Sequence, residues 1–127
     1  MLNKNMHNVY VGGLGEAVAI KHLKKLNHVI LEKNYRGKGF EIDIISKDDF
    51  GGIHFVEVKT RKNTDFGYAY EYVTAKKLEK IKRGAVIYLE INKLDCLVHF
   101  DIIEVYGRIS PFGFKCESIN YIKDVVC

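Results

Sequence analysis

The sequence has a single proline, Pro111, and contains neither an internal repeat nor a low-complexity tract. A chain of 127 residues without a recognisable linker is expected to form one domain over residues 1–127. No apolar run approaches the roughly 20 residues that a bilayer-spanning helix needs, which excludes such a helix. The first residues also lack the apolar segment and cleavage site of a signal peptide, so we expect a cytoplasmic protein.

Cysteines are few and widely separated, at Cys96, Cys116 and Cys127. No two of them form a C-x-x-C pair, which argues against a zinc knuckle and against a thioredoxin-like redox motif. We therefore expect free thiols in a reducing compartment rather than a disulfide framework.

Charge of one sign is not in large excess, since the formal net charge is +4 and the pI is about 8.9. This balance permits a polyanionic partner without requiring one, because many solvated surfaces are equally basic. The local distribution is more informative. Basic residues gather in three segments, at 33–38, 59–62 and 76–83.

Hydrophobic periodicity and turn residues predict two helices and five strands in the order αβββαββ. Such an order is typical of a mixed α/β domain with helices packed against a central sheet. The helices are expected at 13–26 and 74–90, and the strands at 29–35, 40–46, 51–60, 97–107 and 114–124. In the second strand, alternation predicts that Ile42 and Ile44 share one face while Asp43 and Ile45 share the other.

The third strand and the two helices show equally clear patterns. Alternation in the third strand predicts one face with Ile53, Phe55, Glu57 and Lys59 and the other with His54, Val56, Val58 and Thr60. Helical spacing predicts a buried stripe of Ala19, Ile20, Leu23 and Leu26 in the first helix, and one of Leu78, Ile81, Ala85 and Tyr88 or Leu89 in the second. Thr74 is the expected N-cap of the second helix.

Three charged residues stand inside otherwise apolar strands: Asp43 in one strand, and Glu57 and Lys59 in the next. In a hairpin these strands lie about 5 Å apart, so residues on the same face can converge. Two carboxylates at that separation repel, and Mg²⁺ relieves the repulsion because it prefers oxygen ligands. Lys59 would orient the nucleophile and stabilise developing negative charge. Glu16, on the apolar side of the first helix, is a further candidate ligand.

A simpler interpretation remains open, in which Lys59 forms a cross-strand salt bridge with Glu57 or Asp43 at the wet end of a sheet. Such exposed pairs are common and contribute about 0–1 kcal/mol. Glu16 can equally be a first-turn residue that favours the helix dipole and points to solvent.

Several short motifs accompany these charges, and together they form a specific pattern: Gly12-x-x-Gly15-Glu16, Asn34-Tyr35-Arg36, Glu41-Ile42-Asp43, Phe55-Val56-Glu57-Val58-Lys59-Thr60-Arg61, Phe66-Gly67 and Lys77. Over about residues 10–106 the pattern resembles the uncharacterised bacterial YraN-type family. Its Asp43 and Glu57-Val58-Lys59 core resembles the PD-(D/E)XK superfamily of restriction-endonuclease-like proteins, which includes Holliday-junction resolvases. Phe40 departs from the pattern, because the family usually has glycine there.

This resemblance implies a restriction-endonuclease-like fold and a metal-dependent endonuclease acting on structured DNA. Residue by residue, it implies Glu16, Asp43 and Glu57 as ligands of Mg²⁺ or Mn²⁺, with Lys59 beside them. Arg36, Arg61 and Lys77 are expected to contact nucleic-acid phosphates, DNA rather than RNA. A homodimer would allow two strands to be cut symmetrically.

Two other functions stay open: a nucleic-acid-binding module of the same fold without activity, and a small interaction domain whose charged strand is only a salt bridge. Tyrosines and phenylalanines at 66–72 could stack on bases or pack at the edge of the core. The five histidines show no ligand spacing, so none is assigned a role.

Overall fold

The protein is described from a computed structural model, which covers the backbone of residues 4–62 and 75–125 and the side chains of residues 13–61 and 75–125. The aromatic segment at 66–72 and the predicted helix cap at Thr74 lie outside these residues.

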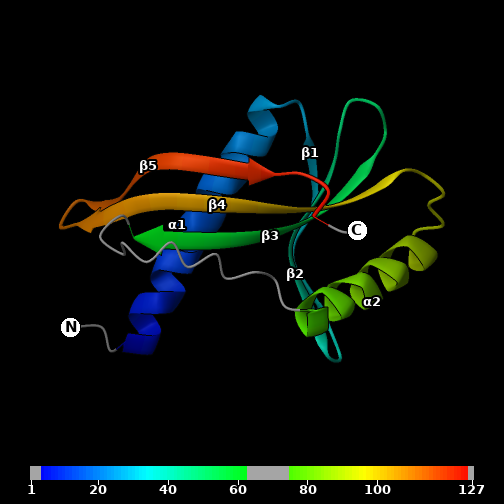
Figure 1. Ribbon diagram of the computed structural model, residues 1–127, viewed down its shortest axis with the longest axis horizontal. Coiled ribbons are helices and arrows are strands. Elements are labelled where there is room, and N and C mark those ends of the chain that lie inside the picture. The colour runs from blue at the N-terminus through cyan, green and yellow to red at the C-terminus, as the bar shows by residue number, and fades with distance from the viewer. Residues whose placement is uncertain (1–3, 63–74, 126–127) are drawn as a thin grey trace.

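Two helices and five strands follow one another in the predicted order αβββαββ (Figure 1). The strands form one sheet in the order β1-β2-β3-β4-β5. Neighbouring strands are antiparallel except β3 and β4, which are parallel and are joined through α2. The elements are α1 (Lys4–Lys25), β1 (Val29–Gly37), β2 (Phe40–Lys47), β3 (Ile53–Lys62), α2 (Ala75–Ile91), β4 (Val98–Ser110) and β5 (Gly113–Ile122).

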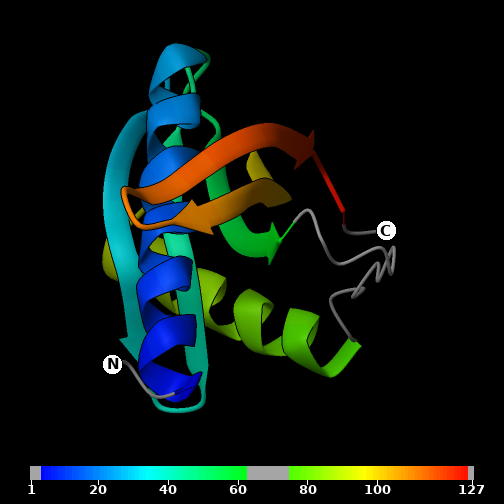
Figure 2. The ribbon, with the colours of Figure 1, turned by 90° about the vertical axis from the view of Figure 1, so that its left-hand side faces the viewer.

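The two helices lie on opposite sides of the sheet, and each covers its own hydrophobic core (Figures 1 and 2). The α2 core is formed by Ile42, Ile45, Ile53, Phe55, Ile81, Ala85 and Tyr88. The α1 core is formed by Ala19, Leu23, Ile44, Val56, Ile103 and Val105. The alternation predicted for β3 is confirmed, because Phe55 belongs to one core and Val56 to the other.

Helix α1 begins nine residues earlier than the sequence predicted, at Lys4 instead of residue 13. The helix continues through Gly12 and Gly13, because each glycine inside a helix costs only about 1 kcal/mol and does not end it. The other end is close to the prediction, because Asn27 adopts a positive φ of 65° and the His28 amide donates to the carbonyl of Leu23. Leu26, predicted to be buried, is 42% exposed beyond the last turn.

Gly15 lets α1 approach β3 closely. A Cβ at this position would lie 1.9 Å from Oγ1 of Thr60, so a larger residue would force the helix and the strand apart. The contact fixes the height of Glu16, the next residue, above the sheet.

Phe40 replaces the expected glycine without disturbing the β1–β2 hairpin. The hairpin closes through Lys38 and Gly39, and Gly39 adopts the positive φ of 81° that the turn requires. The Phe40 ring occupies space left by two other glycines: a Cβ on Gly37 would lie 2.3 Å from it, and one on Gly84 of α2 would lie 2.6 Å from it. Phe40 thereby joins the hairpin to α2.

The alternation predicted for β2 is wrong, because Ile42 lies in the same core as Ile45 and not with Ile44. Regular pairing between β2 and β3 ends at Ile44 and Val56. Beyond that pair, the Asp43 carboxylate takes the place of a backbone acceptor and receives the amide hydrogen of Val58. The period of two in β2 is therefore broken where its pairing with β3 ends, although its pairing with β1 continues to Phe40.

Two expectations about the whole chain can be compared with the described residues. Within residues 4–62 and 75–125, no helix combines the length and hydrophobicity needed to cross a bilayer. Cys96 and Cys116 are free thiols, and Cys127 lies outside the described residues.

Candidate acidic site on β2 and β3

Asp43 and Glu57 lie where β2 and β3 separate. If the pairing of Ile44 with Val56 continued by one residue, these two carboxylates would stand opposite each other. Instead, Oδ2 of Asp43 accepts a hydrogen bond of 2.8 Å from the Val58 amide, and Glu57 is only 8% exposed. Burial and the charge of Glu57 raise the pKa of Asp43 to about 7, although the Val58 hydrogen bond opposes the shift. Ionising both carboxylates is therefore unfavourable, because nearby donors and cations do not fully compensate two negative charges.

Glu16 reaches the same group of carboxylates from α1. It is half-buried, and burial raises its pKa against the opposing effect of a hydrogen bond from Asn34. The charge of Glu57 raises it further, and Glu16 in turn raises the pKa of Asp43. Glu16, Asp43 and Glu57 are thus electrostatically coupled, although they come from three different elements.

Two lysines face these carboxylates. Nζ of Lys77, on the first turn of α2, lies 2.6 Å from Oε1 of Glu57, and Nζ of Lys59 lies 3.6 Å from the same oxygen. Burial lowers the pKa of Lys77, but its interactions with Glu57 outweigh burial and raise it above the ordinary value. The Lys59 side chain is 16% exposed and that of Lys77 is 43% exposed, so Lys77 forms the solvent side of the pair.

The predicted arginines occupy different surroundings. Arg36 is exposed on β1, and its guanidinium forms an ion pair of 3.1 Å with Glu41. Arg61, near the end of β3, is half-buried, and its Nε and Nη2 atoms are shielded from solvent. Arg36 is therefore open to a phosphate, whereas much of the Arg61 guanidinium faces protein.

A groove of about 620 Å³ lies between the β1–β2 hairpin and the start of α2, and Lys77 is one of its lining residues. Phe40 and Glu41 form part of one wall, and Lys76, Lys77 and Lys80 stand along the other. Because Lys77 also contacts Glu57, the basic wall of the groove continues directly into the acidic cluster. A polyanion lying along this wall would contact Lys77, the residue that pairs with Glu57.

The donor set fits a hard divalent cation. Burial and the charge of Glu57 raise the pKa of both Glu16 and Asp43, so a nearby positive charge would stabilise their ionised forms. Mg²⁺ takes carboxylate and carbonyl oxygens as ligands. The ammonium of Lys77 supplies part of that charge, but the raised pKa of Asp43 indicates that it leaves the repulsion incompletely balanced.

No histidine was assigned a role from its spacing, yet the structure brings His54 and His99 together with Asp48 at the other end of β3. The two strands carry the same local pattern, Ile53-His54-Phe55 and Val98-His99-Phe100. Parallel pairing aligns these patterns residue by residue. The repeated dipeptide was a signal in the sequence, but using it required knowing that β3 and β4 are neighbours.

Comparison with known proteins identifies relatives over most of the chain. Residues 15–105 match the family described as "Uncharacterised protein family UPF0102". A "UPF0102 protein" from Acetivibrio thermocellus is 42% identical over 125 residues, which is 96% of this chain and 94% of the relative. "UPF0102 protein CD630_12710" from Clostridioides difficile is 48% identical over 102 residues, 80% of this chain and 89% of the relative. These matches confirm the resemblance to the uncharacterised YraN-type bacterial family, which is UPF0102.

Proposed function

This chain belongs to the uncharacterised protein family UPF0102, and from its own charged residues we propose that it is a Mg²⁺-dependent nuclease hydrolysing phosphodiester bonds in structured DNA. One observation carries the proposal: burial and the nearby charge of Glu57 raise the pKa of Asp43 to about 7, and the ammonium of Lys59 lies 3.6 Å from Glu57. A purely structural salt bridge would not place a second, poorly compensated carboxylate next to the first.

Each residue of the cluster has a role in this proposal. Asp43, Glu57 and Glu16 would hold Mg²⁺ or Mn²⁺ through carboxylate oxygens. When bound, the ion would supply positive charge to the phosphate and lower the pKa of water. Lys59 would hold a water molecule in line with the phosphorus and donate hydrogen bonds to the oxygens on which charge develops.

The groove supports a nucleic-acid substrate. Lys76, Lys77 and Lys80 are spaced along one wall, where they would bind successive phosphates without reading sequence. Arg36 extends the basic surface on the hairpin side. A preference for branched or otherwise structured DNA follows from the resemblance to junction resolvases, and symmetric cleavage of two strands would need a twofold dimer.

A second function is favoured by the 2.6 Å ion pair between Lys77 and Glu57. This ammonium already neutralises one carboxylate, as expected for a nucleic-acid-binding module that keeps the fold and performs no chemistry. Such a module would bind DNA in a salt-dependent manner without needing a metal.

The two functions are distinguished by incubating the purified full chain with junction, flap and single-stranded DNA in Mg²⁺ or Mn²⁺. We expect cleavage by the wild type, a loss of roughly 10²–10³-fold in rate for Lys59→Ala, and an unchanged rate for the matched control Lys115→Ala on β5. Salt-dependent binding without cleavage, retained in Asp43→Asn, would establish the binding module. Absence of binding at low salt would rule out both functions.

A further inference from the structure

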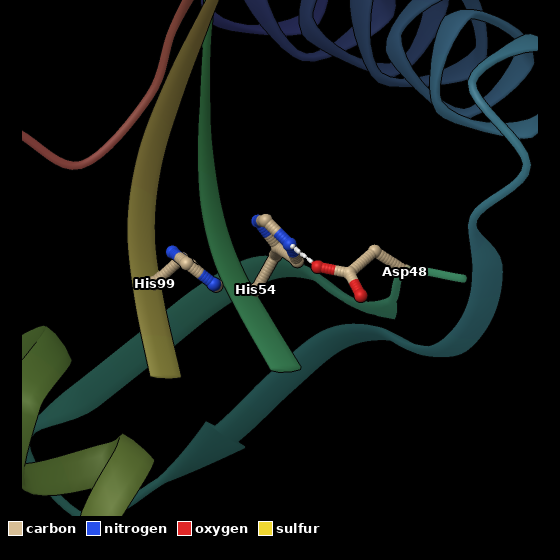
Figure 3. A group of neighbouring side chains, drawn as sticks. All are labelled: Asp48, His54 and His99. Atoms are coloured by element: carbon tan, nitrogen blue, oxygen red, sulfur yellow. Dashed lines mark hydrogen bonds and ion pairs between the residues drawn. The ribbon is translucent and has the colours of Figure 1, made fainter. Parts of the chain in front are cut away.

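A second cluster of metal-ligating side chains lies about 10 Å along β3 from Glu57, close to the start of that strand. We propose that Asp48, His54 and His99 form a binding site for Zn²⁺. Their ligand atoms all lie within 4.8 Å of one another, and the side chains face each other from the β2–β3 turn, β3 and β4 (Figure 3). This inference does not depend on the proposed nuclease function.

The carboxylates behind the two histidines fix which ring nitrogens face the centre. Nδ1 of His54 lies 2.6 Å from Oδ2 of Asp101, and Nδ1 of His99 lies 2.7 Å from Oδ1 of Asp124. An ionised carboxylate only accepts hydrogen bonds, so each Nδ1 carries the proton and donates it. Nε2 of each ring then faces the cluster. In the metal-free protein Nε2 of His54 also carries a proton, which it donates to Oδ2 of Asp48, and Zn²⁺ would displace that proton to solvent. A histidine held from behind by a carboxylate is the usual arrangement around protein-bound zinc.

Asp48 is oriented by the turn in which it lies. Its Oδ1 accepts hydrogen bonds from the amides of Phe50 and Gly52, at 2.8 and 3.0 Å. Its Oδ2 is left to face Nε2 of His54 at 2.7 Å. One oxygen therefore anchors the side chain while the other is presented as a ligand.

Gly52 provides the space in which these atoms meet. A Cβ at this position would lie 2.8 Å from Oδ2 of Asp48 and 3.1 Å from Nε2 of His99. Two of the three ligand atoms thus border the volume that any larger residue would fill. Both histidines also pack against other rings, since His54 lies between His28 and His99 at centroid distances of 4.6 and 4.3 Å.

The charges and the ligand types favour zinc. Three aspartates, Asp48, Asp101 and Asp124, surround the two histidines, so the cluster is acidic before any ion is bound. Two imidazole nitrogens and one carboxylate oxygen suit Zn²⁺ at about 2.0–2.2 Å and leave a fourth tetrahedral position for water. Small rotations of Asp48 and His99 would bring the ligand atoms to the ~3.3 Å separation that this geometry needs. No cysteine thiolate is needed as a zinc ligand in this site.

The test uses the full chain, freed of metal by chelation and titrated with Zn²⁺ against a chromophoric competitor. We expect one equivalent to bind with micromolar or tighter affinity, and His99→Ala to weaken binding by roughly 100-fold or more. Asp124→Asn, which keeps a hydrogen-bond acceptor behind His99, should weaken it by about 10-fold. The matched control Asp49→Asn changes an exposed neighbour of Asp48 and should bind like the wild type, as should a variant with all three cysteines replaced by serine.

A second measurement distinguishes loss of the metal site from misfolding of a variant. Co²⁺ added to the wild type should give visible bands typical of tetrahedral nitrogen and oxygen ligands without a thiolate charge-transfer band. In Gly52→Ala, which retains every ligand, these bands should be weakened or lost. No zinc binding, or equal affinity in the wild type and a folded His99→Ala, would overturn the proposal and leave the cluster as a structural ion-pair network.

Discussion

The two ends of β3 deal with buried carboxylates in opposite ways. At one end, Asp43 lies beside Glu57, and burial together with like charge raises its pKa to about 7. At the other end, burial also acts against ionisation of Asp48, but hydrogen bonds from His54 and two backbone amides hold its pKa at about 2. Among the described residues, Asp48 receives three hydrogen bonds and has no like charge among the main causes of its shift, whereas Asp43 receives one hydrogen bond, from Val58, and lies beside the charge of Glu57.

This contrast separates a cluster that stabilises the fold from one that is under electrostatic strain. Burial raises the pKa of Asp101, but hydrogen bonds from His54 and Tyr121 and from the Asp124 amide lower it below the ordinary value. Asp101 therefore contributes to stability in its ionised form. Asp43 does the reverse, since ionising it in the folded state is less favourable than in the unfolded chain.

The largest effect on stability is expected from Asp101→Ala. Asp101 is 2% exposed, and its loss would leave the buried His54 ring and the Tyr121 hydroxyl without their acceptor. We expect the free energy of unfolding to fall by about 3–5 kcal/mol, measured by urea denaturation at pH 7. Asp49→Ala, which alters an exposed residue, serves as the control. A loss below about 1 kcal/mol would contradict the assigned role.

Asp43→Asn should stabilise the fold, and only above about pH 4. The folded state holds the Asp43 proton more tightly than the unfolded chain, where the pKa is near 3.8. Wild-type stability from this group is therefore full below about pH 4 and is lost as the pH rises to about 7. The asparagine keeps an acceptor for Val58 but carries no charge, so at pH 8 the variant should be more stable by on the order of 3 kcal/mol.

The measurement is urea unfolding of the wild type and Asp43→Asn from pH 4 to pH 8 without divalent metal. Plots of the free energy of unfolding against pH should coincide near pH 4 for the two proteins. As the pH rises, Asp43→Asn should become increasingly more stable than the wild type. Adding Mg²⁺ at pH 8 should stabilise the wild type and have little effect on the variant. Parallel curves across the whole range would show that Asp43 is not under electrostatic strain.

Lys77→Met should give a smaller change that tests the positive side of the acidic cluster. The ammonium lies 2.6 Å from Glu57 but is 43% exposed, so solvent screens much of the interaction. In metal-free buffer we expect the free energy of unfolding to fall by about 1 kcal/mol, because the methionine keeps the aliphatic contacts but not the charge. Mg²⁺ should bind several-fold more tightly by calorimetry, because a competing cation has been removed. Weaker Mg²⁺ binding would mean that Lys77 supports the site instead.

The smallest effect on stability is expected from Arg36→Gln. Its ion pair with Glu41 is exposed at both ends, since the Arg36 side chain is 66% accessible and the Glu41 side chain 50%. The free energy of unfolding should therefore change by less than about 0.5 kcal/mol. If Arg36 contacts a phosphate, the slope of log binding constant against log salt for DNA should decrease by about one. An unchanged slope would remove Arg36 from the nucleic-acid interface.

Local sequence patterns predicted most of the helices and strands. They also predicted the face of the sheet on which Glu57 and Lys59 lie, but not the local geometry of β2 around Asp43. Alternation in β3 placed Glu57 and Lys59 on the same face as Phe55, and the structure confirms that face because Lys77 of α2 reaches Glu57. The same rule failed in β2, because Asp43 replaces a backbone acceptor where pairing with β3 ends, although pairing with β1 continues. In an interior strand, alternation is reliable only where both neighbours are paired with it regularly.

The sequence by itself determined the order of helices and strands, the stripes that α1 and α2 bury, and the presence of charges inside β2 and β3. These features depend on neighbouring residues and on a fixed period, so they can be predicted without knowing the fold. Only the tertiary structure decided that Lys77 meets Glu57 and that His54 lies beside His99. Both contacts depend on how α2 carries the chain from β3 back to a parallel β4, and such long-range packing leaves no local period in the sequence.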